Sequence, residues 1–185
     1  MEPTVTATPF DLRAQARHAD QLLIERLETI VPRLMDAAKI DAWVLVAREY
    51  VEDPVLATML PAAWLSTARR RTILVFTRRG RARAAIARYP VGDAFPQAWD
   101  PADQPDQWAA LTDHLRRSDP ATIAVNTSST FPLADGLTAS EAEALRRALR
   151  PDLDARLVDA DPLAIGWLET RLPSERGTLE QACAI

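Results

Sequence analysis

Five consecutive apolar residues, Trp43-Val44-Leu45-Val46-Ala47, constrain the fold of this chain more than any other feature of its sequence. A strand with one face in water alternates apolar and polar residues, because successive side chains point to opposite faces. The unbroken run therefore predicts a central strand that is covered on both faces. A second run, Ile73-Leu74-Val75-Phe76, has the same requirement. Strands of this kind need helices on both sides of the sheet, so the chain should fold as a layered α/β domain.

A long helix is expected ahead of the first apolar run. Apolar residues recur there at three- and four-residue steps, which is the spacing of one helix face. They are Leu23, Leu27, Ile30, Val31, Leu34, Met35 and Ala38. Pro32 interrupts this pattern, and because proline lacks the amide hydrogen we expect it to kink the helix or divide it in two.

Strand and helix patterns continue to the end of the chain. The second apolar run and residues 82–87 predict a hairpin in which Gly80 supplies the positive φ of the turn. Ser140 followed by Glu143 matches a capping box, and Ser174 is a favourable N-cap. The other elements are expected at residues 54–60 (helix), 106–117 (helix), 123–125 (strand), 140–149 (helix), 155–158 (strand) and 162–169 (helix). This order predicts a mixed β-sheet flanked by helices.

Length and composition limit the domain organisation. With 185 residues, 48% of them hydrophobic and 26% charged, the sequence is typical of a single globular domain. We expect residues 1–10 to form a flexible arm and residues 11–172 to form the α/β domain. Residues 173–185 begin a further helix whose apolar side chains have no following element to bury them. These are Leu179, Ala182, Cys183 and Ile185. We interpret this segment as the linker and first helix of an absent domain, and the chain as a fragment.

The side chains that carry most enzyme chemistry are sparse. His18 and His114 are the only histidines and Cys183 is the only cysteine, and none of them lies in a metal-binding or nucleophile motif. The five glycines are scattered and form no phosphate-binding loop. The sequence therefore predicts no catalytic, cofactor-binding or metal-binding residue in this chain.

Charge and hydropathy limit the partners. The net charge is −4 and no apolar run approaches the ~20 residues that cross a bilayer, so neither nucleic acid nor a membrane is the expected partner. The first ten residues lack the features of a signal peptide, and a cytoplasmic location is the default expectation. The feature that most favours nucleic-acid binding is a group of seven arginines between residues 69 and 83. A hairpin divides them between two faces, however, and Phe76 is the only aromatic residue among them. A solvated edge or an interface with another domain or subunit is the preferred interpretation.

The segment from Arg48 to Asp53 is the candidate functional site. It directly follows the first strand, where open α/β sheets bind their ligands. We expect Arg48, Glu49, Tyr50 and Asp53 to face a substrate or an interface. Arg48 can bind a carboxylate through both arms of its guanidinium group, and Tyr50 offers a hydroxyl on an apolar ring. The alternative is a polar loop whose charges are solvated or cap the next helix.

Several stretches of the sequence resemble one known family. They are Arg26-Leu27-Glu28, Arg33-Leu34-Met35, residues 40–46 (Ile-Asp-Ala-Trp-Val-Leu-Val), residues 48–56, Met59-Leu60-Pro61 and residues 70–76. Together they resemble the N-terminal domain of the creatinase, prolidase and aminopeptidase P metallopeptidases, and in particular the Xaa-Pro peptidase-like branch. Pro173-Ser174-Glu175 resembles the linker into the catalytic domain of that family.

The resemblance implies a creatinase N-terminal-like domain with a ribonuclease H-like, three-layer architecture. In the family, this domain helps to form a homodimer and covers the entrance of a neighbouring active site. The absent C-terminal catalytic domain would hold two divalent metal ions (manganese, cobalt or zinc) through two Asp, one His and two Glu residues, and would cleave Xaa-Pro peptide substrates. None of those ligands is carried by this chain, so the chain alone is expected to be inactive. Two alternatives stay open: a stand-alone protein-interaction module without an enzymatic partner, and a binder of a small molecule or nucleic acid.

Overall fold

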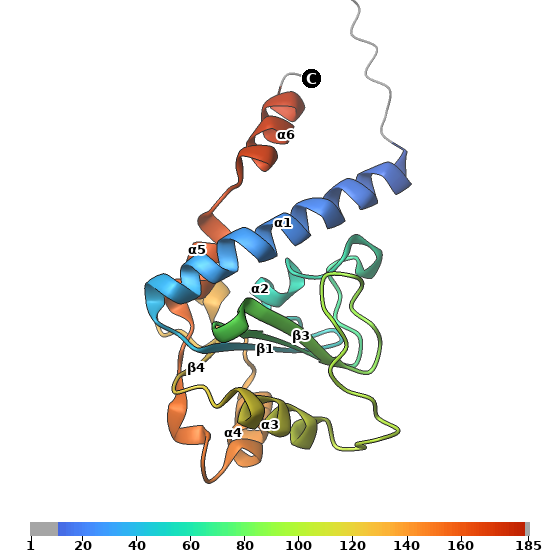
Figure 1. Cartoon of the computed structure of the whole chain (residues 1–185). Coiled ribbons are helices and arrows are strands. Elements are labelled where there is room, and N and C mark those ends of the chain that lie inside the picture. Colours follow the sequence, from blue (N-terminus) through green and yellow to red (C-terminus); the bar gives the residue numbers. More distant parts are fainter. Residues whose placement is uncertain (1–10, 184–185) are drawn as a thin grey trace, which may run out of the picture.

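A five-stranded mixed sheet with the strand order β3-β2-β1-β4-β5 forms the middle layer of the protein (Figure 1). The structure is a computed structural model that describes residues 11–183. β1 pairs antiparallel with β2 and parallel with β4, while β3 pairs antiparallel with β2 and β5 pairs parallel with β4. The strands are β1 (Ala42–Arg48), β2 (Arg71–Thr77), β3 (Ala82–Ala87), β4 (Ile123–Val125) and β5 (Leu157–Asp159).

Helices cover both faces of this sheet, so the chain is a single mixed α/β domain. One face is covered by α1 (Leu12–Ala38), α2 (Pro54–Ala57) and α5 (Asp161–Glu169). The other is covered by α3 (Gln107–Ser118) and α4 (Ala139–Leu149). A last helix, α6 (Pro173–Cys183), extends away from these layers (Figure 1). Within residues 11–183, no helix is both long enough and apolar enough to cross a membrane.

β1 is buried on both faces, as its unbroken apolar sequence predicts. Trp43 and Leu45 pack in the layer that contains α1, whereas Val44 and Val46 pack in the layer that contains α3 and α4. All four side chains are almost completely buried. Burying a side chain of this size stabilises a fold by roughly 1.5–3 kcal/mol. The prediction of a central strand between two helical layers is therefore confirmed.

Most of the predicted elements lie close to their observed positions. β3 and β4 occupy residues 82–87 and 123–125, as predicted. β5 begins at Leu157 rather than at residue 155, because residues 154–156 form a 3-10 turn. The helix predicted at residues 54–60 ends at Ala57, and the hydroxyl of Thr58 donates a hydrogen bond to the carbonyl of Val55 (2.7 Å).

α1 continues through Pro32, so of the two expected effects of this proline, a kink or a division, the division into two helices does not occur. A proline in a helix interior removes one hydrogen bond and costs about 3 kcal/mol or more. Residues on both sides of it, among them Ile30 and Met35, are buried in the core of the domain. Because each such side chain contributes roughly 1.5–3 kcal/mol on burial, the apolar face of α1 offsets the cost of the proline.

The predicted capping box of α4 is also wrong. The helix begins at Ala139, and Thr138 occupies the capping position, so Ser140 lies inside the first turn. Glu143 accepts a hydrogen bond from Arg147 (2.8 Å). The acidic residue three positions after Thr138 is Glu141, whose carboxylate does not cap the helix but pairs with Arg48 and Arg71.

The predicted N-cap of the last helix is also corrected. α6 begins at Pro173, so Ser174 lies in its first turn, where its hydroxyl donates a hydrogen bond to Glu25 (2.8 Å). Gly80 lies in a 3-10 turn between β2 and β3, and the residue after it, Arg81, has a positive φ of 48°.

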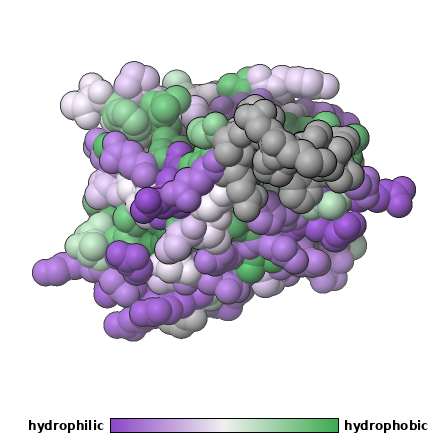
Figure 2. Space-filling model, turned by 90° about the horizontal axis from the view of Figure 1, so that it is seen from above, coloured by the Kyte–Doolittle hydropathy of each residue, from purple (hydrophilic) through white to green (hydrophobic). Residues whose placement is uncertain are grey.

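The two ends of the chain are described in part. Residues 1–10, expected to form an arm, and Ile185 lie outside the described residues. Of the predicted C-terminal apolar stripe, Leu179 and Cys183 are exposed, and the side chain of Ala182 also lies outside the description. Figure 2 shows the molecule from above, where hydrophilic residues predominate and hydrophobic residues form separate groups between them.

Candidate functional site

A tight turn at the carboxyl end of β1 holds the first candidate residues. The N–H of Val51 donates to the carbonyl of Arg48 (2.9 Å), and the N–H of Arg48 donates to the carbonyl of Val51 (3.3 Å). Tyr50, the third residue of the turn, adopts a left-handed φ of 69°. Holding a non-glycine residue there costs roughly 1–3 kcal/mol. Tyr50 is 86% exposed, so packing of its ring within the domain does not offset this cost.

Glu49 joins this turn to the start of β2. Its N–H donates to the carbonyl of Arg70 (2.7 Å), and its carboxylate accepts a hydrogen bond from the N–H of Arg70 (3.2 Å). The carboxylate of Glu52 accepts one from the N–H of Tyr50 (3.1 Å). Glu52 therefore satisfies a backbone group of the turn, and the half-buried Glu49 links the turn to the segment before β2.

Further left-handed residues lie beside this turn, in the segment that leads into β2. They are Leu65 (φ 51°), Ser66 (φ 57°) and Arg70 (φ 56°). With Tyr50, they make up four of the seven non-glycine residues that have a positive φ in residues 11–183. Such residues cluster at binding sites and switch regions, because they persist only where the surrounding structure holds them. The edge of the sheet beside Tyr50 is therefore the strongest candidate site in the described chain.

Large apolar side chains remain exposed at this edge, and we call them the edge patch: Tyr50, Val51, Leu65 and Tyr89. Leu65 is 83% exposed. Two open hollows flank the patch. The first, which we call the edge groove, has a volume of about 720 Å³ and lies between Arg48, Arg71, Arg88 and Trp99. The second has a volume of about 710 Å³ and lies on the side of Leu65. Tyr50 and Tyr89 line both hollows.

Arg48 and Arg71 share the buried carboxylate of Glu141. Arg71 donates to it through two nitrogens (2.6 and 3.2 Å), and the Nε of Arg48 lies 3.2 Å from it. The Glu141 side chain is only 4% exposed. The two arginines occupy directly opposite positions of the β1–β2 ladder, where like charges repel each other. The carboxylate offsets this repulsion and anchors α4 to the end of the sheet.

The structure places Asp53 in the interior, apart from the other three candidate residues. Its carboxylate accepts hydrogen bonds from the N–H groups of Val55 (2.9 Å) and Leu56 (2.8 Å), and so caps α2. The side-chain amide of Asn126 donates to both carboxylate oxygens (3.0 and 2.9 Å) and accepts from the indole of Trp43 (2.9 Å). Burial raises the pKa of Asp53, although these hydrogen bonds act in the opposite direction. Asp53 therefore organises the loop after β1 and does not face a substrate or a partner.

Sequence reasoning did not single out Asn126, Glu141 or Tyr89. Asn126 could have been found, because it directly follows a strand in the same way as the candidate segment follows β1, and parallel strands end at the same edge of a sheet. Glu141 gave no such signal, since it lies 70 residues from Arg71 in the sequence.

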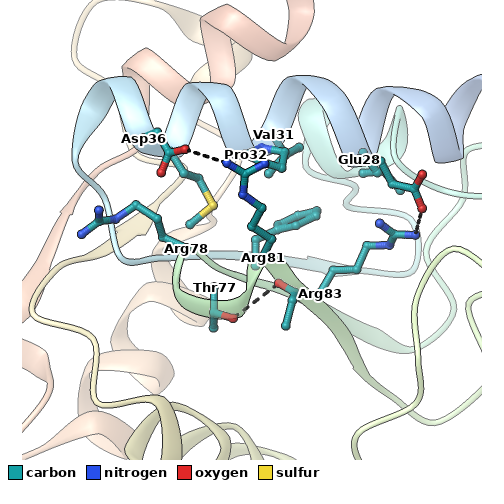
Figure 3. Close-up of a pocket in the computed structure, with 12 residues that line it drawn as sticks. Glu28, Val31, Pro32, Asp36, Thr77, Arg78, Arg81 and Arg83 are labelled. Atoms are coloured by element: carbon teal, nitrogen blue, oxygen red, sulfur yellow. Dashed lines mark hydrogen bonds and ion pairs between the residues drawn. The ribbon is translucent and has the colours of Figure 1, made fainter.

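A smaller hollow of about 220 Å³ lies between α1 and the β2–β3 hairpin (Figure 3). Its arginines are each matched by an acid: Arg81 by Asp36 (3.5 Å), Arg83 by Glu28 (3.2 Å), and Arg78 by Asp41. Together with Arg71, which pairs with Glu141, four of the seven arginines between residues 69 and 83 are thus paired within the domain. A hollow whose charges are already matched is a weaker candidate for binding a ligand than the edge groove.

The described residues do not fit a metal centre. Within residues 11–183, no three His, Cys, Asp or Glu side chains come together as potential ligands. His18 belongs to α1 and His114 to α3, on opposite sides of the sheet (Figure 1). Burial, together with the charge of Arg117, lowers the pKa of His114. The two divalent ions implied by the family resemblance thus have no ligand set in this part of the chain.

Comparison with known proteins finds similarity among solved structures alone. No protein-family profile matches the sequence, and no curated protein matches it either. Among solved structures, the chain is similar to part of an Xaa-Pro dipeptidase from Bacillus anthracis, with a TM-score of 0.46 and 14% sequence identity. The similarity covers 77% of this chain and 34% of the dipeptidase chain, so this chain spans about a third of the length of that protein.

Proposed function

We propose that this chain is the non-catalytic N-terminal domain of an Xaa-Pro dipeptidase or aminopeptidase. Its edge patch would contact a neighbouring domain or subunit beside the active-site entrance. The resemblance of residues 26–77 to the creatinase, prolidase and aminopeptidase P family supports this choice of enzyme. A mixed sheet flanked by helices is compatible with the N-terminal domain of that family.

The exposed, strained Tyr50 is the observation that carries the proposal. Its left-handed backbone costs stability, and its ring packs against little within the domain. Leu65 lines the second hollow together with Tyr50, and it likewise combines a positive φ with an exposed apolar side chain. Aromatic side chains of this kind are enriched at protein interfaces, where they dominate the binding energy. A contact with a partner would bury both side chains and offset the strain.

In the intact enzyme, the two kinds of domain would divide the work. The C-terminal catalytic domain would hold the two divalent metal ions and the reacting peptide, and two copies of the enzyme would form a dimer. This domain would cover the entrance. Arg48, whose side chain is 47% exposed, would offer hydrogen bonds to a carboxylate of the peptide substrate.

The coding sequence beyond Ile185 provides the first test. A downstream domain that carries two Asp, one His and two Glu residues in the spacing of the family would support the proposal. A coding sequence without such a domain would instead favour a stand-alone interaction module that uses the same edge patch.

The second test removes the exposed leucine of the edge patch in the full-length protein. Leu65→Ser should weaken dimerisation, or raise KM, by about tenfold, since a buried interface anchor contributes more than about 1 kcal/mol. Leu133→Ser is the matched control, because Leu133 is also exposed but lines neither hollow. Sedimentation velocity and steady-state kinetics measure the two effects. Equal behaviour of the two variants and the wild type would contradict a docking role for the edge patch.

A further inference from the structure

Arginines outnumber acids at the edge groove. Arg48 and Arg71 pair across β1 and β2, and Arg88 directly follows β3 at the same end of the sheet. Arg70 lies beside them, and all four line the groove. The acids that balance this charge are Glu49, on the lining, and the buried Glu141. The groove therefore carries an excess of positive charge, unlike the hollow beside α1, where each arginine has its own acid.

Two of these guanidinium groups are open to a ligand. Glu141 engages Arg48 and Arg71, whereas the side chains of Arg70 and Arg88 form no hydrogen bond or ion pair with the described part of the chain. Both residues are exposed. A guanidinium group presents a planar pair of donors that fits the two oxygens of a carboxylate or phosphate.

The walls of the groove suit a ligand that carries apolar or aromatic groups beside its charged groups. Tyr50, Tyr89 and Trp99 line it. Its base is held in place by Gln107 at the start of α3, whose amide donates to the carbonyls of Arg71 (2.9 Å) and Ile86 (2.7 Å). With a volume of about 720 Å³, the groove is far larger than one small anion requires.

We propose that the edge groove binds an acidic polypeptide segment. Arg70 and Arg88 bind carboxylates of the segment, and the rings of Tyr50 and Tyr89 contact its apolar side chains. The added negative charge relieves the repulsion among the arginines at the ends of the three strands. This inference goes beyond the proposed function, because it assigns a ligand chemistry to the groove whether or not a catalytic domain is joined to the chain.

The test titrates the chain of residues 1–185 at low salt with a capped tetraglutamate peptide. Capped tetraglutamine is the neutral control, and inorganic phosphate tests for a free anion as the ligand. Backbone amide shifts in NMR spectra report binding, and the same spectra show whether each variant is folded. Arg70→Gln and Arg88→Gln each remove one open guanidinium group. Arg79→Gln is the matched control, because Arg79 is also exposed but follows the opposite end of β2.

Tetraglutamate should shift the amides of Arg70, Arg88 and Tyr89, and tetraglutamine should not. Each of the two groove variants should weaken binding by about fivefold, the upper range for one exposed ion pair, while Arg79→Gln leaves it unchanged. Phosphate binding as tight as that of tetraglutamate would overturn the assignment of a polypeptide ligand. Absence of shifts, or an equal loss in Arg79→Gln, would overturn the site. Because no partner domain takes part in this experiment, its failure is distinguishable from failure of the edge patch to dock.

Discussion

Gly136 packs so closely against Asp53 that even a single added methyl group should disrupt the loop after β1. A Cβ atom at position 136 would lie 2.1 Å from the Oδ2, 2.4 Å from the Cγ and 2.9 Å from the Cβ of Asp53. No ordinary contact is this short, and Asp53 is completely buried, so it has no solvent-facing direction in which to move. Gly136→Ala must therefore displace either Asp53 or the segment that contains residue 136.

The expected cost follows from the hydrogen bonds of Asp53. Displacing its carboxylate removes the cap of α2, worth about 0.5–2 kcal/mol. It also leaves the amide of Asn126 without an acceptor, which costs about 1–3 kcal/mol for a buried group. Overpacking adds about 1–3 kcal/mol. Because these terms overlap, we expect Gly136→Ala to lower the free energy of unfolding by about 3–5 kcal/mol in total.

Urea denaturation of three glycine variants measures this cost against matched controls. At Gly177 in α6, an added Cβ would meet no atom within 4 Å apart from its chain neighbours and the backbone of its own helix, so Gly177→Ala should leave the free energy of unfolding unchanged or raise it by up to about 1 kcal/mol. At Gly166, the Cβ would lie 2.4 Å from the end of the Leu34 side chain, which can rotate away, so Gly166→Ala should fall between the other two. A value for Gly136→Ala within about 1 kcal/mol of that for Gly177→Ala would refute the reasoning.

Three other predictions concern titration, protection and activity. Burial raises the pKa of Asp53, so the native state takes up its proton more readily than the unfolded chain, and this carboxyl adds stability as the pH falls through the raised pKa toward the unfolded value of 3.8. The hydrogen bond from Arg78 lowers the pKa of Asp41, so the stability from that pair is present above 3.8 and is lost as the pH falls through the lowered pKa. When urea titrations are repeated at falling pH, the stability of Asp53→Asn relative to the wild type should therefore decrease, and that of Asp41→Asn should increase. If both differences change in the same direction with pH, one of the two assignments is wrong. In hydrogen exchange, the amides of residues 44–46 should be among the slowest, because β1 is central and covered on both faces, and fast exchange there would contradict this. Finally, residues 1–185 should not hydrolyse Xaa-Pro peptides with added manganese, cobalt or zinc, because the described residues bring no ligand set together; turnover that follows the protein through two chromatographic columns would disprove this.

The sheet was predictable because its central strands carry an unambiguous local pattern. The apolar runs at residues 43–47 and 73–76 must be buried on both faces of the sheet. The first run lies in β1 and the second in β2. Helix caps were less predictable, since Thr138 and Ser140 are both suitable capping residues two positions apart. The register of α4 brings Glu141 to Arg71, and this contact between distant parts of the chain is absent from any local pattern.

The sequence by itself determined the alternation of strands and helices and the location of a polar segment directly after β1. Every strand must end in a turn or loop, and the turn after the central strand β1 contains Arg48, Glu49 and Tyr50. These residues therefore lie at the end of the sheet, as expected. The tertiary structure alone decided that Asp53 is buried against Asn126, and that Leu65 and Tyr89 lie beside Tyr50. These outcomes depend on strand order and on how loops pack, and such contacts join residues too far apart in the chain for periodicity or spacing to encode them.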